Sequence, residues 1–600
     1  MQESQRNSLR VSDVLISRLI QHGIDHVFLV VGGNAMYLHD AVRISGLNYT
    51  AFQNEQSAAM AAEAYSRLTG KISLCISTSG PGASNLATGI AGAYFDSVPI
   101  FFITGQPKST QLVPSSHNDK FGVRQVGTFE FPAIKVFHSI LKSAKVLTLC
   151  DEPSQIVDEL VTIATSDRPG PVLLEVSVDI QAKTILPTTD APLIKHRSLE
   201  VFNPSIFEII QNELNFATKP LILIGHGVRV SGLAEAYLEE IERLKIPVVS
   251  TQLGKDFMGY ENELFVGHIG IRGNRAANHA VQQCDLLITI GSSLHQQNIG
   301  YEIDCFAPKA KKIILDFEKS VSGKYKFQNS MFIDQNLDNF LIGFKKLSLD
   351  ISKIRSWKES LLTLKENLSP LKEPYKIDQE NINIYEFARA LSLTATKESV
   401  VITDAGLCFY IMGQAFQLTQ GQRYLVSGGL GAMGYTLPAA IGAGITNIEN
   451  IIGVTGDGSA QLNVQDLATL ANSQKNISLF IINNEGYASI RNTQKSFFGA
   501  EFIGCSEESG VLMPNWRLIA EAYSLHYYKF KKPLNLITKI KKVLDLPGPK
   551  IIEVIAQIEQ EVLPGVANYI DENGDLRSRP LDIMIPELFS EEVSDGRHFN

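Results

Sequence analysis

Short, uninterrupted apolar runs recur along the chain and are separated by polar or glycine-rich stretches. Examples are residues 72–78, 99–104, 451–455 and 477–482. Runs of this length, apolar at successive positions rather than alternate ones, are typical of strands buried on both faces of a parallel sheet. The longer amphipathic stretches between them, such as residues 463–474, predict connecting helices. The pattern therefore predicts an α/β protein.

The predicted elements fall into three α/β blocks. We expect a first domain at 1–182, a middle domain with flanking linkers at 183–380, a third domain at 381–562, and a C-terminal tail at 563–600. The first and third blocks share one layout, in which a strand is followed by a Ser-Gly turn and a helix of small residues. We predict three doubly wound parallel-sheet domains, with the first and third alike and the middle one Rossmann-like.

Composition narrows the classes of partner. The 600 residues are 44% hydrophobic and 20% charged, with a net charge of −9, which is ordinary for a globular protein and gives no basic field for nucleic acid or an anionic membrane. The first ten residues lack a signal-like apolar core, and no apolar stretch is long enough to span a bilayer. We expect a cytoplasmic protein whose six scattered cysteines are buried thiols.

Polar residues follow two of the apolar runs. Gly456, Asp457, Gly458 and Ser459 end the first, and Asn484 ends the second. Because parallel strands end at the same sheet edge, these groups should meet, with glycines letting backbone amides approach an anion. Asp457, the Asn484 amide and the carbonyl of Gly486 suit Mg²⁺ that is shared with phosphate oxygens. The spacing favours this site over two ordinary turns.

This pattern resembles the binding motif for thiamine diphosphate (ThDP) and Mg²⁺. In that family a glutamate contacts the cofactor's aminopyrimidine, and the matching residue is Glu55 in an Asn-Glu-Gln segment. A glutamate at a helix start is common in itself, but the segment at 79–85, SGPGASN, resembles a neighbouring motif of acetohydroxyacid synthases. The resemblance implies cofactor contacts from Gly32, Gly33, Pro81, Gly82 and Asn85.

A third segment, 427–434, reads SGGLGAMG and is similar to the same synthases. There the methionine, here Met433, wedges the two cofactor rings into a V, and the carbonyl at Gly431 accepts a hydrogen bond from the pyrimidine amine. Glu55, Gly431 and Met433 are therefore the expected catalytic residues. The remaining expected cofactor contacts lie in the turn after the apolar run 400–403, in the metal loop or just after it: Gly406, Leu407, Cys408, Gly456, Asp457, Gly458, Ser459, Asn484, Gly486, Tyr487 and Ala488.

The chain as a whole most resembles acetohydroxyacid (acetolactate) synthases. That likeness implies a carboligase that decarboxylates pyruvate or a related 2-oxo acid and transfers the two-carbon acyl-anion unit to a carbonyl acceptor. It also implies a homodimer or homotetramer with active sites between subunits. None of the twelve histidines is adjacent to another, which disfavours a simple decarboxylase of this superfamily.

The sequence departs from those synthases at several positions, so the identity of the carbonyl acceptor stays open. A tryptophan that gauges the second substrate is replaced by Thr493, and the candidate substrate contacts are Gln106, Phe129 and Arg491. The tail, with RSRPL at 577–581, resembles synthase-like enzymes of cell-surface polysaccharide pathways. Such a tail could cover the active-site mouth or form a solvated arm. Alternatives are a carboligase acting on a nucleotide-linked keto-sugar, a ThDP-dependent hydrolase of a cyclic dione, and a non-catalytic nucleotide-binding homologue.

The same resemblance raises the question of FAD, which these synthases bind in the middle domain. The Gly225-His226-Gly227 turn favours a phosphate contact, although a GxG alone is a weak signal. The synthases' arginine-bearing stretch corresponds to residues 291–294, GSSL, which lack the guanidinium. Binding of FAD stays open from the sequence.

Overall fold

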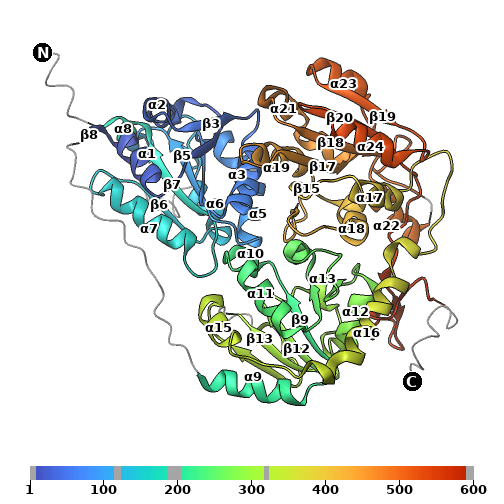
Figure 1. The fold of residues 1–600 in the computed structure, drawn as a ribbon. Helices are drawn as coiled ribbons and strands as arrows, with labels where there is room; N and C mark the ends of the chain where they lie inside the picture. Colours follow the sequence, from blue (N-terminus) through green and yellow to red (C-terminus); the bar gives the residue numbers. More distant parts are fainter. Residues whose placement is uncertain (1–8, 114–122, 186–203, 317–322, 500, 589–600) are drawn as a thin grey trace, which may run out of the picture.

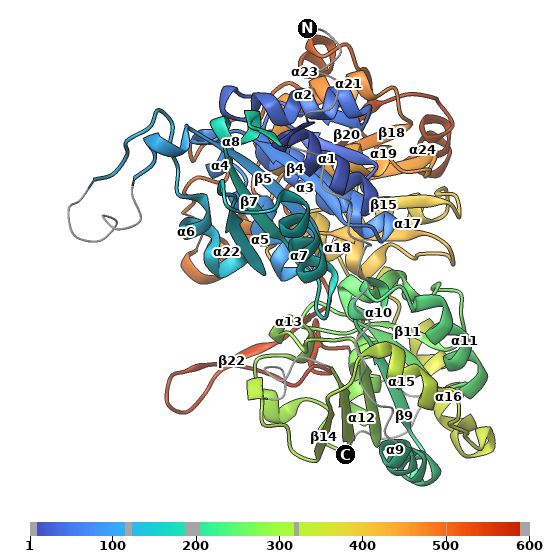
Figure 2. The ribbon, with the colours of Figure 1, turned by 90° about the vertical axis from the view of Figure 1, so that its left-hand side faces the viewer.

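The computed structural model describes residues 9–113, 123–185, 204–316, 323–499 and 501–588. Three parallel six-stranded sheets organise this part of the chain. The first and third sheet domains lie side by side, and the middle domain lies beneath both (Figures 1 and 2). Among the described residues, no helix has the length and apolar character needed to cross a membrane.

The first and third domains share one topology. Their strand orders are β3-β2-β4-β5-β7-β6 and β16-β15-β17-β18-β20-β19. Numbered by chain order within each domain, both read 2-1-3-4-6-5, so the predicted likeness is confirmed. The strands are β2 (His26–Leu29), β3 (Asn48–Ala51), β4 (Ser73–Ser77), β5 (Ile100–Gln106), β6 (Ser143–Val146) and β7 (Val172–Ser177), then β15 (Ser399–Thr403), β16 (Arg423–Val426), β17 (Asn450–Gly456), β18 (Ile477–Asn483), β19 (His526–Phe530) and β20 (Lys550–Ile555).

Helices cover both faces of these two sheets (Figure 1). Each apolar strand is therefore shielded on both sides, as its sequence predicts. The longer helices are α1 (Val11–Gln21), α2 (Met36–Ser45), α3 (Glu55–Thr69), α5 (Ala87–Phe95) and α7 (Pro153–Thr165), then α17 (Ile384–Ser392), α18 (Gly406–Ala415), α19 (Thr436–Gly444), α22 (Ala488–Phe498) and α24 (Leu536–Leu544).

The middle domain has the Rossmann strand order. Its sheet runs β11-β10-β9-β12-β13-β14, which is 3-2-1-4-5-6 in chain order and confirms the prediction. Helices α11 (Ala234–Leu244), α12 (Arg275–Gln283) and α16 (Ile351–Asn367) pack around it. Its strands are β9 (Pro220–Ile224), β10 (Val248–Ser250), β11 (Phe265–His268), β12 (Leu286–Ile290), β13 (Lys311–Leu315) and β14 (Ser330–Ile333).

Small residues bring α3 of the first domain against α19 of the third. A Cβ added to Gly442 would lie 2.2 Å from the Ala61 carbonyl oxygen, so the two helix backbones are nearly in contact. Beside this seam Glu63 accepts hydrogen bonds from Arg67 and Tyr435, and Arg67 donates to the Val426 carbonyl. The alanine-rich composition of α3 thus serves a tight helix–helix interface.

One predicted helix differs from the structure. The segment 463–474 begins inside a 3-10 turn, η8 (Gln461–Asp466), and only α21 (Leu467–Ser473) is α-helical. Asn463 leaves helical geometry, its side chain donates to the Gly434 carbonyl, and Asp466 accepts from the Gln53 amide. These contacts to distant loops outweigh the local preference for a regular helix.

The described part of the tail is folded onto the middle domain. It forms β21 (Gly565–Val566) paired with β24 (Met584–Ile585), and a hairpin of β22 (Asn568–Ile570) and β23 (Leu576–Ser578) that projects in Figure 2. Arg275 binds the Met584 carbonyl, and Arg577 pairs with Asp571 and Glu302. The tail up to residue 588 is therefore anchored on the middle domain, although most side chains of its β22–β23 hairpin are exposed. Residues 589–600 and most of the expected linker at 183–200 lie outside the described residues.

The expectation of six buried thiols needs one correction. Cys75, Cys284, Cys408 and Cys505 are buried and Cys305 is partly so, but Cys150 is exposed in the turn that follows β6. The strand ends at Val146, so Cys150 and its apolar neighbour Leu149 both lie beyond the sheet and are exposed.

Candidate active site

The metal-loop residues gather at the carboxyl end of the third sheet. Strands β15, β17 and β18 are neighbours, so the loops that follow them share one crevice. Asp457 is buried, and its two carboxylate oxygens accept hydrogen bonds from the amides of Gly458 (2.8 Å) and Gly486 (3.0 Å). Two backbone amides therefore fix the orientation of this carboxylate.

Burial raises the pKa of Asp457 to about 6, although the Gly486 and Gly458 amides and the Arg491 charge act in the opposite direction. A cation at this carboxylate would offset the cost of burying its charge. Asn484 is also buried, and its side-chain amide makes no hydrogen bond within the described part of the chain. The donor set predicted for Mg²⁺ thus fits the geometry: a fixed carboxylate, an uncommitted amide and the nearby Gly486 carbonyl.

Two glycines of this crevice have steric reasons to be glycine. A Cβ on Gly458 would lie 2.4 Å from the Tyr487 ring. Gly486 has a φ of +119°, and a Cβ there would lie 2.5 Å from the Cys505 carbonyl oxygen. The close approach of the two loops therefore depends on the absence of side chains at both positions.

Two helices begin at the crevice. Gly406, Leu407 and Cys408 form the first turn of α18, and Tyr487 and Ala488 begin α22. A Cβ on Gly406 would lie 3.9 Å from the Cβ of Ser489, so the two helix starts are adjacent. Because the first amides of a helix lack intrahelical partners and carry partial positive charge, this arrangement suits a phosphate.

Asp404, which the sequence offered only as part of a turn near the phosphates, has a structural role that sequence reasoning missed. Its buried carboxylate accepts from the hydroxyls of Ser459 (2.7 Å) and Thr455 (2.9 Å), and Ser459 in turn accepts from the Gly434 amide (2.8 Å). Burial raises the pKa of Asp404, against these hydrogen bonds. The relay ties the turn after β15 to the metal loop and to the 427–434 loop. In the sequence, the signal that could have predicted this relay was a carboxylate residue at the end of one strand together with hydroxyl residues at the end of the next.

The 427–434 loop presents Met433 to open space. The Asp96 carboxylate of the first domain accepts from the Gly428 (3.0 Å) and Gly429 (2.7 Å) amides and so holds the start of the loop. Gly431 has a φ of +68°, with no atom near the position of an added Cβ. Met433 is 38% exposed, an unusual state for a methionine preceding a buried helix.

The first-domain residues gather at the carboxyl end of their own sheet. Glu55 is buried and begins α3, and the Asn85 amide donates to its Oε2 at 3.0 Å. A Cβ on Gly82 would lie 3.1 Å from the other oxygen, Oε1, and one on Gly32 would lie 2.4 Å from Thr78. Gly33 and Pro81 begin the short helices η1 (Gly33–Ala35) and α4 (Pro81–Ser84) of the same edge.

The structure thus assembles two half-sites. Glu55, Gly82 and Asn85 meet on the first sheet, and Asp457 and Asn484 meet on the third. Among the described residues, no hydrogen bond or ion pair joins Glu55 to Asp457 or Met433.

The candidate substrate residues are engaged differently from expectation. Gln106 donates to the Phe131 carbonyl (2.5 Å) and to Glu175 (3.1 Å), while Phe129 is 63% exposed. The Arg491 guanidinium is buried and donates to the carbonyls of Asn484 (2.5 Å), Glu485 (2.8 Å), Cys505 (3.2 Å) and Ile558 (3.2 Å). Through these four hydrogen bonds from Nη1 and Nη2, Arg491 holds the metal loop in place, and its contact with an acceptor stays a prediction.

Comparison with known proteins shows that the domains carrying the two half-sites match one family of enzymes. The chain matches the thiamine pyrophosphate enzyme N-terminal TPP binding domain at residues 9–125, the central domain at 208–340 and the C-terminal TPP binding domain at 404–554. The chain belongs to the thiamine pyrophosphate enzyme family. Glu55 lies in the first matched domain, and Asp457 and Asn484 lie in the third.

Curated relatives show which enzymes of this family the chain resembles. Acetolactate synthase 2, chloroplastic, of Zea mays is 31% identical over 92% of this chain and 86% of the relative. The protein of that name from Nicotiana tabacum is 32% identical over 92% and 83%. Acetolactate synthase large subunit of Cyanidium caldarium is 31% identical over 92% and 94%. The chain is therefore a ThDP-dependent, acetolactate synthase-like enzyme of the carboligase type.

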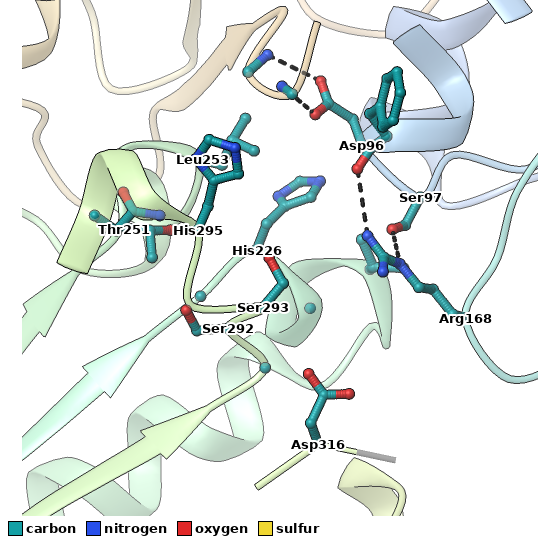
Figure 3. A pocket seen from close by; sticks show the side chains of 18 of the residues that line it. Asp96, Ser97, Arg168, His226, Thr251, Leu253, Ser292, Ser293, His295 and Asp316 are labelled. Atoms are coloured by element: carbon teal, nitrogen blue, oxygen red, sulfur yellow. Dashed lines mark hydrogen bonds between the residues drawn. The ribbon is translucent and has the colours of Figure 1, made fainter. Parts of the chain in front are cut away.

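A cavity of about 1500 Å³ lies between the middle domain and the other two. Gly225 and Gly291 of the middle domain line it. In Figure 3, Asp316 lies at the bottom of the view, Asp96 at the top and Arg168 at the right. The Gly227 amide donates to the Gly291 carbonyl at 2.9 Å, so this donor of the GxG turn is already used. Both ring nitrogens of His226 lack a hydrogen-bond partner within the described chain.

Proposed function

We propose that the protein is a ThDP- and Mg²⁺-dependent carboligase that decarboxylates pyruvate or a related 2-oxo acid and transfers the two-carbon unit to a carbonyl acceptor. The observation that carries this proposal is the Asp457 carboxylate, which two amides orient beside the uncommitted Asn484 amide and two helix starts. When bound, ThDP supplies a nucleophilic carbon and an electron sink for decarboxylation.

In this proposal the third domain holds the cofactor's anionic end. Asp457, Asn484 and the Gly486 carbonyl would bind Mg²⁺, and amides at the starts of α18 and α22 would meet the diphosphate. Ser459 is committed to Asp404 and Gly434, so its hydroxyl positions the loops. Met433 would support the rings from the 427–434 loop, with the Gly431 carbonyl as an acceptor.

Glu55 would hold and move a proton at a ring nitrogen of the aminopyrimidine. The Asn85 amide engages Oε2, which leaves Oε1 for that exchange. Buried carboxylates without a basic partner are costly in a folded protein, and Asn85 partly meets that cost. The fixed orientation of the Glu55 carboxylate suits a residue that acts as a general acid and base.

We propose that two copies of the chain complete the site. Glu55 and Asp457 lie on different sheets, and Leu430 and Met433 are 37% and 38% exposed on the loop between them. A second copy would bring its first domain over this loop and cover the apolar side chains. The homodimer is the minimal assembly, and a homotetramer would contain two such pairs.

The relatives' names favour pyruvate as both donor and acceptor, with acetolactate as the product. The folded tail and Thr493 in place of the synthases' tryptophan favour a different acceptor, and a nucleotide-linked keto-sugar is the second candidate. FAD is proposed for the middle-domain cavity, and the visible absorption spectrum of the purified protein tests for a bound flavin. The cytoplasmic location remains a prediction.

Incubation with pyruvate, ThDP and Mg²⁺, followed by NMR, tests the proposal. Carbon dioxide together with acetolactate supports the synthase assignment. A new adduct that appears only when a nucleotide-linked keto-sugar is added supports the second candidate, a carboligase acting on that sugar. Aldehyde as the sole product would replace carboligation with simple decarboxylation. Turnover of a cyclic dione without decarboxylation of pyruvate would identify a hydrolase. Reactions without ThDP serve as controls.

A further inference from the structure

Lys255 places a buried ammonium group between two domains. It lies in η5 (Gln252–Phe257), which follows β10 of the middle domain, and only 5% of its surface is exposed. Its Nζ donates to the carbonyls of Met412 (3.0 Å), Gly413 (2.5 Å) and Phe416 (2.5 Å). These carbonyls form the C-terminal end of α18 in the third domain.

The three acceptors match the three N–H groups of an ammonium ion. The last carbonyls of a helix lack intrahelical donors and carry partial negative charge, so a cation there is favourable. Burial lowers the pKa of Lys255 to about 7. A neutral amine has two N–H groups and could donate to only two of the three carbonyls, and the Tyr424 ring centroid, 5.2 Å from Nζ, also favours the cation.

The opposite end of the same helix is part of the cofactor site. Gly406 and Cys408 lie in its first turn, about 15 Å along the axis from the Lys255 end for a ten-residue helix. Gln252, also in η5, donates to the Phe409 carbonyl at 2.8 Å, so this segment holds α18 at two points. Because α18 is one continuous helix, we expect a shift at its C-terminal end to displace its first turn as well.

The neighbouring residue of η5 secures a second part of the site. Asp256 accepts from Arg423 (2.7 Å) and from the Tyr424 amide (3.2 Å), both on β16. Strand β16 leads directly into the 427–434 loop, which carries Met433. The side chain of Leu253 also lies 2.6 Å from where a Cβ of Gly428 would be. One short segment of the middle domain therefore contacts both α18 and the strand that leads into the Met433 loop.

We propose that Lys255 is a positioning residue for the ThDP site, which holds α18 so that its first-turn amides meet the diphosphate. The proposal rests on the proposed function. If the role is real, loss of the ammonium group weakens ThDP binding. A purely structural role predicts lower stability with unchanged ThDP affinity in the folded fraction.

Lys365 provides a matched control. It is a buried lysine whose Nζ donates to the carbonyls of Tyr260 (2.5 Å) and Asn262 (3.2 Å), with the Tyr260 ring centroid 4.4 Å away. These carbonyls lie in the loop before β11 and carry no part of the half-sites. Substitution to methionine at either position removes the charge and keeps most of the side-chain volume.

The test compares the wild type, Lys255→Met and Lys365→Met by calorimetric titration with ThDP at saturating Mg²⁺. Unsatisfied helix carbonyls and a displaced first turn should raise the ThDP dissociation constant about tenfold in Lys255→Met. The KM for pyruvate should change little. Lys365→Met should lower the unfolding temperature without changing the ThDP dissociation constant.

Wild-type ThDP affinity in Lys255→Met, or an equal loss in Lys365→Met, would overturn the inference. If Lys255→Met does not fold, the variant Gln252→Leu provides the test, because it removes the hydrogen bond to the Phe409 carbonyl. Weaker ThDP binding by this variant supports positioning through η5, and unchanged ThDP binding rejects it. Failure of the wild type to bind ThDP would instead refute the proposed function, so the two failures are distinguishable.

Discussion

The Asp457 carboxylate should make the cofactor-free protein less stable as pH rises. Its pKa in an unfolded chain is the ordinary 3.8, and burial raises it to about 6 in the fold. Between these values the folded state retains a proton that the unfolded state releases. The stabilisation from the protonated form is complete below pH 3.8 and is lost as pH rises through about 6.

The magnitude follows from the same pKa change. A rise of about two pH units in pKa corresponds to about 3 kcal/mol in the free energy of unfolding. Asp457→Asn removes the titration. At low pH the two proteins should differ by a constant amount, because an amide cannot accept from both the Gly458 and Gly486 amides. From pH 4 to pH 7.5 the wild type should then lose about 3 kcal/mol relative to the variant.

Urea unfolding of the cofactor-free proteins measures this difference. Trp516 is buried in α23 (Trp516–Ala522) of the third domain, and Trp357→Phe leaves it as the sole tryptophan. Its fluorescence then follows the domain that contains Asp457. A difference between wild type and Asp457→Asn that stays constant from pH 4 to 7.5 would refute the reasoning. Mg²⁺ with ThDP should restore stability to the wild type alone.

Three further substitutions have defined outcomes. Glu55→Gln should retain ThDP binding but slow exchange of the thiazolium C2 proton by about 10²–10⁴-fold, measured by NMR in deuterium oxide; unchanged exchange would remove Glu55 from proton transfer. Arg491→Met should weaken Mg²⁺ binding and lower the unfolding temperature, since four carbonyls lose their donor; a change confined to the KM of the acceptor would show a substrate role instead. Gly458→Ala should abolish ThDP binding through a clash with Tyr487, and Tyr487→Ala in the same chain should partly restore it; no restoration would point to a direct need for the Tyr487 side chain.

Much of the fold was predictable because its signals are local. Apolar runs at 451–455 and 477–482 became β17 and β18, since a strand buried on both faces requires apolar residues at every position. The Asp457 and Asn484 positions followed from the same runs, because parallel strands release their loops at one edge. The glycine at 458 was predicted to let the backbone approach an anion, whereas its close packing against Tyr487, and that of Gly486 against Cys505, came only from the structure.

Tertiary structure decided the roles that depend on distant partners. Arg491 was assigned to an acceptor from its charge, yet a carbonyl 67 residues away shares in its hydrogen bonding. Lys255 meets carbonyls 157 to 161 residues further along, and Asn463 leaves the helix to bind Gly434. Backbone carbonyls have no signature in the sequence, since every residue carries one.

The sequence by itself determined most strands and the order of the three α/β domains, and it predicted the residues of the two half-sites, because spacing and residue type carry these signals. Only the tertiary structure showed that no hydrogen bond or ion pair joins Glu55 to Asp457 within the described chain, and that η5 of the middle domain secures α18. Such relations arise from how whole domains pack, which is set by surface shape and by the sum of many weak contacts rather than by any local pattern.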